Sequence, residues 1–257
     1  MIEEIRPYLT TLKLKRIEEI LECELKQARS QKVSYSSFLL NLLKQEYEYK
    51  RQRTIANRIK QAGLSEQWTL ETFPFKLQKG VDKKQIYEFA ELDFIRQAEN
   101  IVMIGSTGVG KTGLSEAILL KAIYGDYTAK KIKASDLFEE LRESISDRSS
   151  RTLIKRLTRI DALLIDEFGY MNLNSEQCNL FFKLIDNRHL KKSTMITTNL
   201  GFQEWANFLG KSPLVSALLN RLLHKCHTII INGPSLSVPK YKIPREAYTS
   251  SEKDKPS

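Results

Sequence analysis

The segment IVMIGSTGVGKT, residues 101–112, constrains the fold more than any other part of this sequence. Its four apolar residues predict a buried strand, and the apolar periodicity after the loop predicts a helix over residues 112–124. Gly105, Gly108 and Gly110 lie between them, where glycine allows backbone angles that a Cβ would oppose. A strand, a glycine-rich loop and a helix in this order are typical of α/β folds with a parallel sheet.

The loop matches the phosphate-binding pattern G-x-x-x-x-G-K-[ST]. In this pattern backbone N–H groups and the positive end of the following helix hold phosphate oxygens. Lys111 would reach the β- and γ-phosphates of ATP, and the Thr112 hydroxyl would bind Mg²⁺. We therefore expect ATP and Mg²⁺ as ligands. The predicted ATP-binding residues are Gly105, Ser106, Thr107, Gly108, Val109, Gly110, Lys111, Thr112 and Gly113.

Short β-type segments alternate with helical patterns from Asn100 onward. The predicted strands are residues 101–104, 130–134, 162–166, 194–198 and 228–232. This alternation predicts a five-stranded parallel sheet with helices on both faces. We expect this α/β domain to span residues 100–240, after a connector at 64–99 that carries aromatic anchors and one short helix.

Two acidic residues follow the apolar run ALLI. Asp166, at the end of this predicted strand, would help to hold Mg²⁺, and Glu167 would act as general base on a water molecule. The alternative is a buried strand that ends in two acids by chance, but buried adjacent carboxylates are costly without a cation. Asn199, after the run TMITT, would orient the water or sense the γ-phosphate; alone it would be a turn residue.

Residues 1–63 predict a small all-α domain. Residues 8–62 show helical periodicity, with Ser36 or Ser37 as a candidate N-cap and Gly63 as the stop of the last helix. The apolar face of that helix would include Phe38, Leu42 and Leu43.

The chain has 41 Lys and Arg against 31 Asp and Glu, a formal net charge of +10. Such a balance favours a polyanionic partner, most simply nucleic acid, over a surface that is merely solvated. The helical domain would bind either DNA or a partner protein, and its candidate DNA-binding residues are Arg51, Arg53 and Arg58.

The three cysteines show no C-x-x-C spacing, which favours a reduced compartment. Cys23 and Cys178 lie in helical apolar patterns, so we expect both in the core. The N-terminus lacks the apolar run of a signal peptide, and no segment has the eighteen apolar residues of a membrane span. We therefore expect a cytoplasmic protein without a membrane partner, and a mobile tail at residues 241–257.

Several segments together resemble the IstB-like family of AAA+ ATPases, which are helper proteins of insertion-sequence transposition and relatives of DnaC-type helicase loaders. The resemblance covers about residues 64–240 and rests on GSTGVGKT, LLIDEFGYMNLNSEQCNLFFKLIDNRH, STMITTN, FQEWANFLG and ALLNRLLHKCHTIII. It implies an AAA+ P-loop fold, with Lys111 and Thr112 as nucleotide anchors, Asp166 and Glu167 as metal-binding and hydrolytic acids, and Asn199 as sensor.

The resemblance also implies an arginine finger at Arg221, which would reach the γ-phosphate in a neighbouring subunit. The alternative for Arg221 is an ion pair within its own chain. Arg188 is a second candidate, for which a surface role is favoured. Little chain remains after the last strand for the helical lid of many AAA+ ATPases, so no second sensing arginine is identified.

Residues 134–144 and 149–161 predict two helices that resemble the insertion of initiator-type AAA+ proteins, which lines the DNA-facing side of their assemblies. Lys155, Arg156 and Arg159 would contact DNA phosphates there. The alternative is a solvated basic face.

These expectations lead to an ATP-dependent helper ATPase of transposition. It would assemble as a homo-oligomeric ring or spiral on double-stranded DNA and present target DNA to a transposase. The alternatives are a replicative helicase loader, which would act on single-stranded DNA, and a nucleotide-switched adaptor with negligible turnover.

Overall fold

The computed structural model describes residues 2–65, 68–169, 173–209 and 213–236 of the 257-residue chain. Within these residues five strands form one parallel sheet in the order β2-β3-β4-β1-β5. The strands are β1 (Asn100–Gly105), β2 (Ala129–Lys133), β3 (Ala162–Phe168), β4 (Ser193–Thr198) and β5 (Cys226–Ile231). All five lie where the sequence predicts them, and the parallel α/β fold is confirmed.

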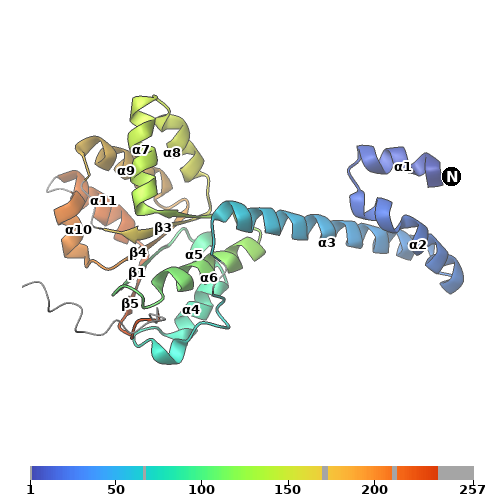
Figure 1. Ribbon diagram of the computed structural model, residues 1–257, viewed down its shortest axis with the longest axis horizontal. Coiled ribbons are helices and arrows are strands. Elements are labelled where there is room, and N and C mark those ends of the chain that lie inside the picture. Colours follow the sequence, from blue (N-terminus) through green and yellow to red (C-terminus); the bar gives the residue numbers. More distant parts are fainter. Residues whose placement is uncertain (1, 66–67, 170–172, 210–212, 237–257) are drawn as a thin grey trace, which may run out of the picture.

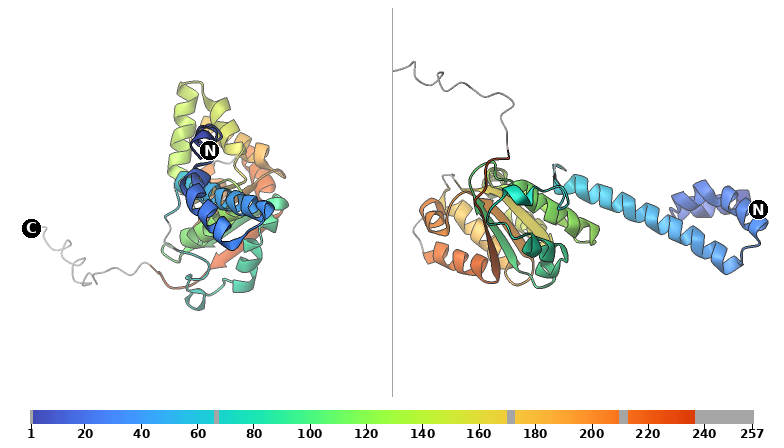
Figure 2. Two further views of the ribbon diagram at one scale, coloured as in Figure 1. Left: turned by 90° about the vertical axis from the view of Figure 1, so that its right-hand side faces the viewer. Right: turned by 90° about the horizontal axis from the view of Figure 1, so that it is seen from below.

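Helices cover both faces of the sheet (Figures 1 and 2). Alternate residues of a strand point to opposite faces. Ile101 and Met103 therefore pack with α6 (Lys111–Tyr124), whereas Val102 packs with the opposite core. That second core is built on α7 (Ala134–Ser146), α8 (Ser150–Thr158), α9 (Ser175–Arg188), α10 (Phe202–Leu209) and α11 (Pro213–Leu223).

The connector folds against the α6 side of the sheet. Phe73, Phe89 and Phe94 are buried in the same core as β1. The predicted single helix is wrong, because the segment forms two helices, α4 (Lys83–Ala90) and α5 (Asp93–Arg96). Leu92 separates them in the left-handed conformation, with φ of 67°, which a continuous helix does not accept.

The N-terminal region consists of α1 (Ile2–Thr11), α2 (Lys15–Gln31) and α3 (Tyr35–Ala62). The last helix ends at Gly63, as predicted, with φ of 69°. Its N-cap is neither Ser36 nor Ser37. Ser34 caps it instead, since the Ser34 hydroxyl accepts a hydrogen bond from the Ser37 amide at 3.2 Å and the two later serines lie inside the first turn.

The 28-residue helix α3 projects as an arm that carries α1 and α2 away from the sheet (Figure 1). The core of α1, α2 and the outer part of α3 is small: Leu9, Ile17, Leu21 and Leu42. The predicted apolar face of α3 is wrong in part, because Leu43 is exposed. Cys23 is also exposed, contrary to expectation, since α2 packs on its neighbours through Ile17 and Leu21 instead.

The inner end of α3 is fixed to the α/β domain. Arg51 donates to the backbone oxygen of Tyr124 at 3.1 Å, and Arg58 pairs with Asp126 at 3.4 Å. Ile55 and Ala62 pack against Ile123 of α6. Two of the three predicted DNA-binding arginines of the arm therefore have partners within the chain, whereas Arg53 is exposed.

In the described ranges, no helix has both the length and the apolar composition that crossing a membrane requires.

Candidate nucleotide and metal site

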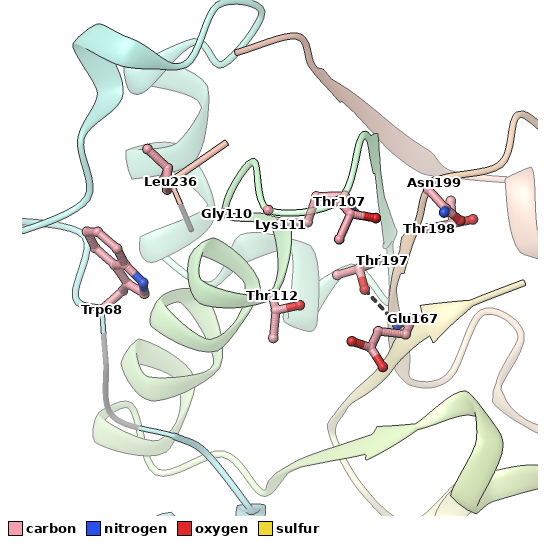
Figure 3. A pocket seen from close by; sticks show the side chains of 11 residues that line it. Trp68, Thr107, Gly110, Lys111, Thr112, Glu167, Thr197, Thr198, Asn199 and Leu236 are labelled. Carbon is pink, nitrogen blue, oxygen red and sulfur yellow. Dashed lines mark hydrogen bonds between the residues drawn. The ribbon is translucent and has the colours of Figure 1, made fainter. Parts of the chain in front are cut away.

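A pocket of about 590 Å³ opens beside the glycine-rich loop, at the carboxyl ends of the parallel strands (Figure 3). This edge is where ligands bind in open α/β sheets. Eleven residues line the pocket: Trp68, Thr107, Gly108, Gly110, Lys111, Thr112, Glu167, Thr197, Thr198, Asn199 and Leu236. It therefore brings together the predicted phosphate loop, the predicted base and the predicted sensor.

Positive φ angles shape the loop at two of the three glycines that the sequence singles out, and Gly105 is the exception. Gly108 and Gly110 have φ of 83° and 93°, and Gly110 is the N-cap of α6. This conformation turns backbone N–H groups toward the pocket. Val109 is buried beneath the loop, whereas Ser106 and Thr107 are exposed.

The Lys111 ammonium group folds back onto its own loop. It donates to the backbone oxygens of Gly105 and Ser106, both at 2.8 Å. Burial lowers the pKa of Lys111, and the charges of Asp166 and Glu167 oppose this shift. These two backbone oxygens hold the ammonium group in the structure. We expect a bound phosphate group to replace them as its partner.

Thr112 and Asp166 form the polar floor of the site. The Thr112 hydroxyl donates to Asp166 Oδ1 at 2.8 Å, and Thr197 donates to the same oxygen. Because Thr112 gives its proton to Asp166, its lone pairs stay free for a cation. No cluster of three or more His, Cys, Asp or Glu side chains occurs among the described residues. A hydroxyl and one carboxylate beside a phosphate loop fit Mg²⁺, which keeps several waters and phosphate oxygens as ligands.

A partly buried lysine lies behind Asp166. Lys131 on β2 pairs with Glu116 Oε1 at 2.6 Å and with Asp166 Oδ2 at 3.4 Å. Burial acts to lower the pKa of Lys131, but the hydrogen bond to Glu116 and the charge of Asp166 outweigh it, so the pKa is raised. The other oxygen of Glu116 accepts from the Ser65 amide and hydroxyl at 2.8 and 2.6 Å.

Glu167 sits on an irregularity of β3. The register with β4 shifts between Ile165 and Phe168, and Glu167 has φ of 58°, which is strained for a residue with a side chain. The Thr197 hydroxyl accepts from the Glu167 amide at 2.9 Å and holds this conformation. As a result Asp166 points inward, and Glu167 is exposed and lines the pocket (Figure 3).

Asn199 follows β4 and lines the pocket on the same side as Glu167 (Figure 3). Thr198 supports the turn before it, because its hydroxyl donates to the backbone oxygen of Phe168 at 2.6 Å. The predicted base and sensor thus come from adjacent strands.

Sequence reasoning missed two residues at the opposite end of the pocket. Trp68 packs on the first turn of α6, where a Cβ on Gly113 would come within 2.4 Å of the Trp68 ring. Leu236 donates its amide to the Gly108 backbone oxygen at 2.7 Å. The connector sequence showed an aromatic residue without showing where it packs, and no local signal brings Leu236 to the loop.

Arg221 does not line the pocket of its own chain. It pairs with Asp186 at 2.7 Å and lies over the Phe182 ring at 4.9 Å. About a third of the Arg221 side chain remains exposed. The ion pair within the chain, the alternative expected for Arg221, is therefore present, and an additional contact with a neighbouring subunit stays a prediction.

The structure contradicts the surface role that the sequence predicts for Arg188. The residue is 1% exposed, and burial lowers its pKa to about 9. Its guanidinium donates to the backbone oxygens of Leu157, Ile160 and Ser193 and to the Thr194 hydroxyl. Arg188 therefore ties α8, α9 and β4 together and is no finger candidate.

The predicted basic residues of α8 face two different clefts. Lys155 and Arg159 line a cleft of about 380 Å³ with Arg151 of α8 and Lys183 of α9, and in the described part of the chain no acidic side chain pairs with these four. Arg156 lines another cleft, where it pairs with Glu140 at 2.6 Å.

Comparison with known proteins agrees with this geometry. Residues 8–242 match the model of the family described as IstB-like ATP binding protein. The IS21 insertion-sequence ATP-binding protein of Pseudomonas aeruginosa is 34% identical over 91% of this chain and 88% of that protein. The IS5376 counterpart of Geobacillus stearothermophilus is 34% identical over 99% of both chains.

Solved structures share the fold. The crystal structure of DnaI covers 66% of this chain and 90% of that chain, with a TM-score of 0.55 and 20% identity. AMPPCP-bound DnaA from Aquifex aeolicus covers 65% of this chain and 51% of that chain, with a TM-score of 0.53 and 20% identity. These neighbours establish the AAA+ P-loop fold. With the family match and the phosphate loop in its pocket, the chain belongs to the IstB-like ATP-binding proteins.

Proposed function

We propose that this protein is an ATP-hydrolysing helper of transposition that assembles on double-stranded DNA and presents it to a transposase. One observation carries the proposal. The pocket combines a phosphate loop, a metal-binding pair and a candidate base in a chain whose relatives are named for insertion sequences.

Each residue of the pocket would have its own role in ATP hydrolysis. Lys111 would leave its two carbonyl partners and bind the β- and γ-phosphates, while the loop amides hold the remaining phosphate oxygens. Mg²⁺, when bound by Thr112 and through water by Asp166, would neutralise charge on the phosphates. Glu167 would accept a proton from the attacking water, and Asn199 would orient that water or the γ-phosphate.

Two surfaces outside the pocket are suited to binding other molecules. The α8–α9 cleft presents Arg151, Lys155, Arg159 and Lys183, which suits the phosphates of a duplex. The arm exposes Leu39, Leu40, Leu43 and Tyr47 on α3, an apolar surface that suits a protein partner, such as another copy or the transposase. We assign partner binding to residues 1–63 and ATP binding to residues 64–240.

ATP would favour assembly if it contacts two subunits at once. Such a ligand stabilises the assembled state by its higher affinity for that state. Arg221 is the proposed second contact. Hydrolysis would then remove the stabilisation and dismantle the assembly.

The test is DNA binding by the full-length chain, with duplex and single-stranded DNA compared in ATP, in ADP and without nucleotide. We expect tight binding to the duplex in ATP only, and none by Lys111→Ala. Lys121→Ala is the matched control, since Lys121 lies on the same helix and pairs with exposed Glu71. Preference for single-stranded DNA would favour a helicase loader, and ATP binding without turnover would favour an adaptor.

A further inference from the structure

The strongest feature that the proposed reaction does not use is the partly buried lysine behind Asp166, the proposed metal-binding acid. Lys131, Glu116 and Asp166 have side chains that are 15%, 4% and 2% exposed. They come from β2, α6 and β3, so three elements place them together. A lysine ammonium group is seldom buried to this degree unless acids surround it.

Every carboxylate oxygen of the two acids has a partner. Asp166 Oδ1 accepts from Thr112 and Thr197, and its Oδ2 faces Lys131. Glu116 Oε1 faces Lys131, and its Oε2 accepts from Ser65. Among the described residues, Lys131 is the one cation in direct contact with both acids, so it is their shared ion-pair partner in the protein without metal.

We propose that Lys131 is the internal counter-cation of the metal site: it positions Asp166 before Mg²⁺ arrives and thereby weakens Mg²⁺ binding. This inference rests on the proposed function, because it assigns Asp166 to Mg²⁺. A cation that contacts Asp166 Oδ2 repels a second cation bound near Oδ1, and this repulsion is stronger beside the buried Asp166 carboxylate than between two charges in bulk water. Lys131 is thus a positioning residue rather than a catalytic one.

The decisive measurement is the gain in nucleotide affinity that Mg²⁺ produces. A fluorescent ADP is titrated with the full-length protein in EDTA and in Mg²⁺. The dissociation constant in EDTA is then divided by the dissociation constant in Mg²⁺. Using the ratio cancels any loss of direct attraction between Lys131 and phosphate. We expect Lys131→Met to raise this ratio by at least about threefold, because repulsion is removed while Asp166 remains.

Two variants serve as controls. Lys130→Met removes the same charge from the neighbouring residue, which points to the other face of β2, and should leave the ratio unchanged. Lys131→Arg keeps the charge and should keep the ratio near that of the wild type. The cleft of about 320 Å³ that Lys131 lines with Gly63 and Asp136 gives room for the longer side chain.

Thermal unfolding gives a readout without nucleotide. Lys131→Met should lower Tm in EDTA, since it leaves two buried carboxylates without their ion-pair partner. Mg²⁺ alone should then raise the Tm of the variant by more degrees than that of the wild type. If Lys131→Met does not fold, Glu116→Gln/Lys131→Met removes one of the two charges and is measured in the same way.

An unchanged or smaller ratio, with an equal effect of Mg²⁺ on Tm, would show that Lys131 is only structural and would overturn the inference. Failure of the wild type to bind any nucleotide would instead overturn the proposed function. In that case the Tm comparison with Mg²⁺ alone still decides whether Lys131 opposes the metal.

Discussion

At the scale of single residues, Glu167 combines an unfavourable backbone conformation with an exposed carboxylate at the pocket. Backbone strain of this kind costs about 1–3 kcal/mol and persists where the surroundings enforce it. Here Thr197 enforces it through the Glu167 amide. The backbone position is thus fixed before ATP binds, which suits a group that must meet a water molecule.

We expect Glu167→Gln to bind ATP normally and to lose nearly all hydrolysis, because the shape and the proposed metal ligand remain while the proposed base is lost. Single-turnover hydrolysis and nucleotide titration measure the two effects. Glu176→Gln, at an exposed residue in the first turn of α9, is the control and should hydrolyse at the normal rate. Normal hydrolysis by Glu167→Gln would show that Glu167 is not the base.

The buried hydrogen bonds of Arg188 lead to a second prediction at the scale of single residues. Arg188→Met should lower the free energy of unfolding by about 3 kcal/mol or more, since buried carbonyl groups lose their donors. Urea unfolding measures this loss. Arg142→Met, at an exposed pair on α7, should change it by less than about 0.5 kcal/mol. A loss of that small size at Arg188 would contradict its structural role.

The residues of the site differ in how well sequence could place them. Lys111, Thr112 and Asp166 follow from a motif and from a strand end, because their neighbours in the chain define them. The roles of Arg188 and Lys131 could not be predicted in this way, since their partners come from distant segments of the chain. The sequence shows each of them only as a charged residue in an amphipathic pattern. Trp68 and Leu236 were missed for the same reason.

At the scale of elements, the strands were predictable because each is a short apolar run between helical patterns. The break at Leu92 and the cap at Ser34 were not, since competing local choices differ little in energy. The fold of the connector affects the site, because the connector places Trp68 at one end of the pocket. Glu167 of β3 and Asn199 after β4 lie at the other end (Figure 3).

Trp68 is therefore expected to contact the base of the nucleotide. Addition of ADP should change tryptophan fluorescence in the wild type and not in Trp68→Phe, because the second tryptophan, Trp205, is fully buried in the opposite core. Trp68→Ala should weaken ADP binding on the order of tenfold through lost stacking. Equal affinity would place the base elsewhere.

The cleft between α8 and α9 predicts which basic residues bind DNA. Lys155→Ala/Arg159→Ala should weaken duplex binding at least about tenfold and lower its salt dependence, because two phosphate contacts are lost. Arg156→Ala is the matched control on the same helix. Its partner is Glu140, so binding should change less than about twofold. Equal losses in both would contradict the assignment of the cleft.

At the scale of the whole molecule, we propose that the pocket and the arm act in an assembly of several chains. The pocket of one chain holds Lys111 and Glu167, while Arg221 lies outside it on α11 and pairs with Asp186. The arm carries exposed leucines away from the sheet (Figure 1). Both features fit a protein that works as an assembly, in which a neighbouring chain completes each site.

The most direct test of this central claim is the ATPase activity of a mixture of Arg221→Ala and Lys111→Ala on duplex DNA. Each variant alone should be nearly inactive, since one lacks the proposed arginine finger, a group worth about 10³ or more in rate, and the other lacks the proposed phosphate anchor. The mixture should recover part of the activity, because Lys111 of one chain can then meet Arg221 of the next. Inactivity at every mixing ratio, with both chains shown to assemble together, would contradict a site shared between subunits.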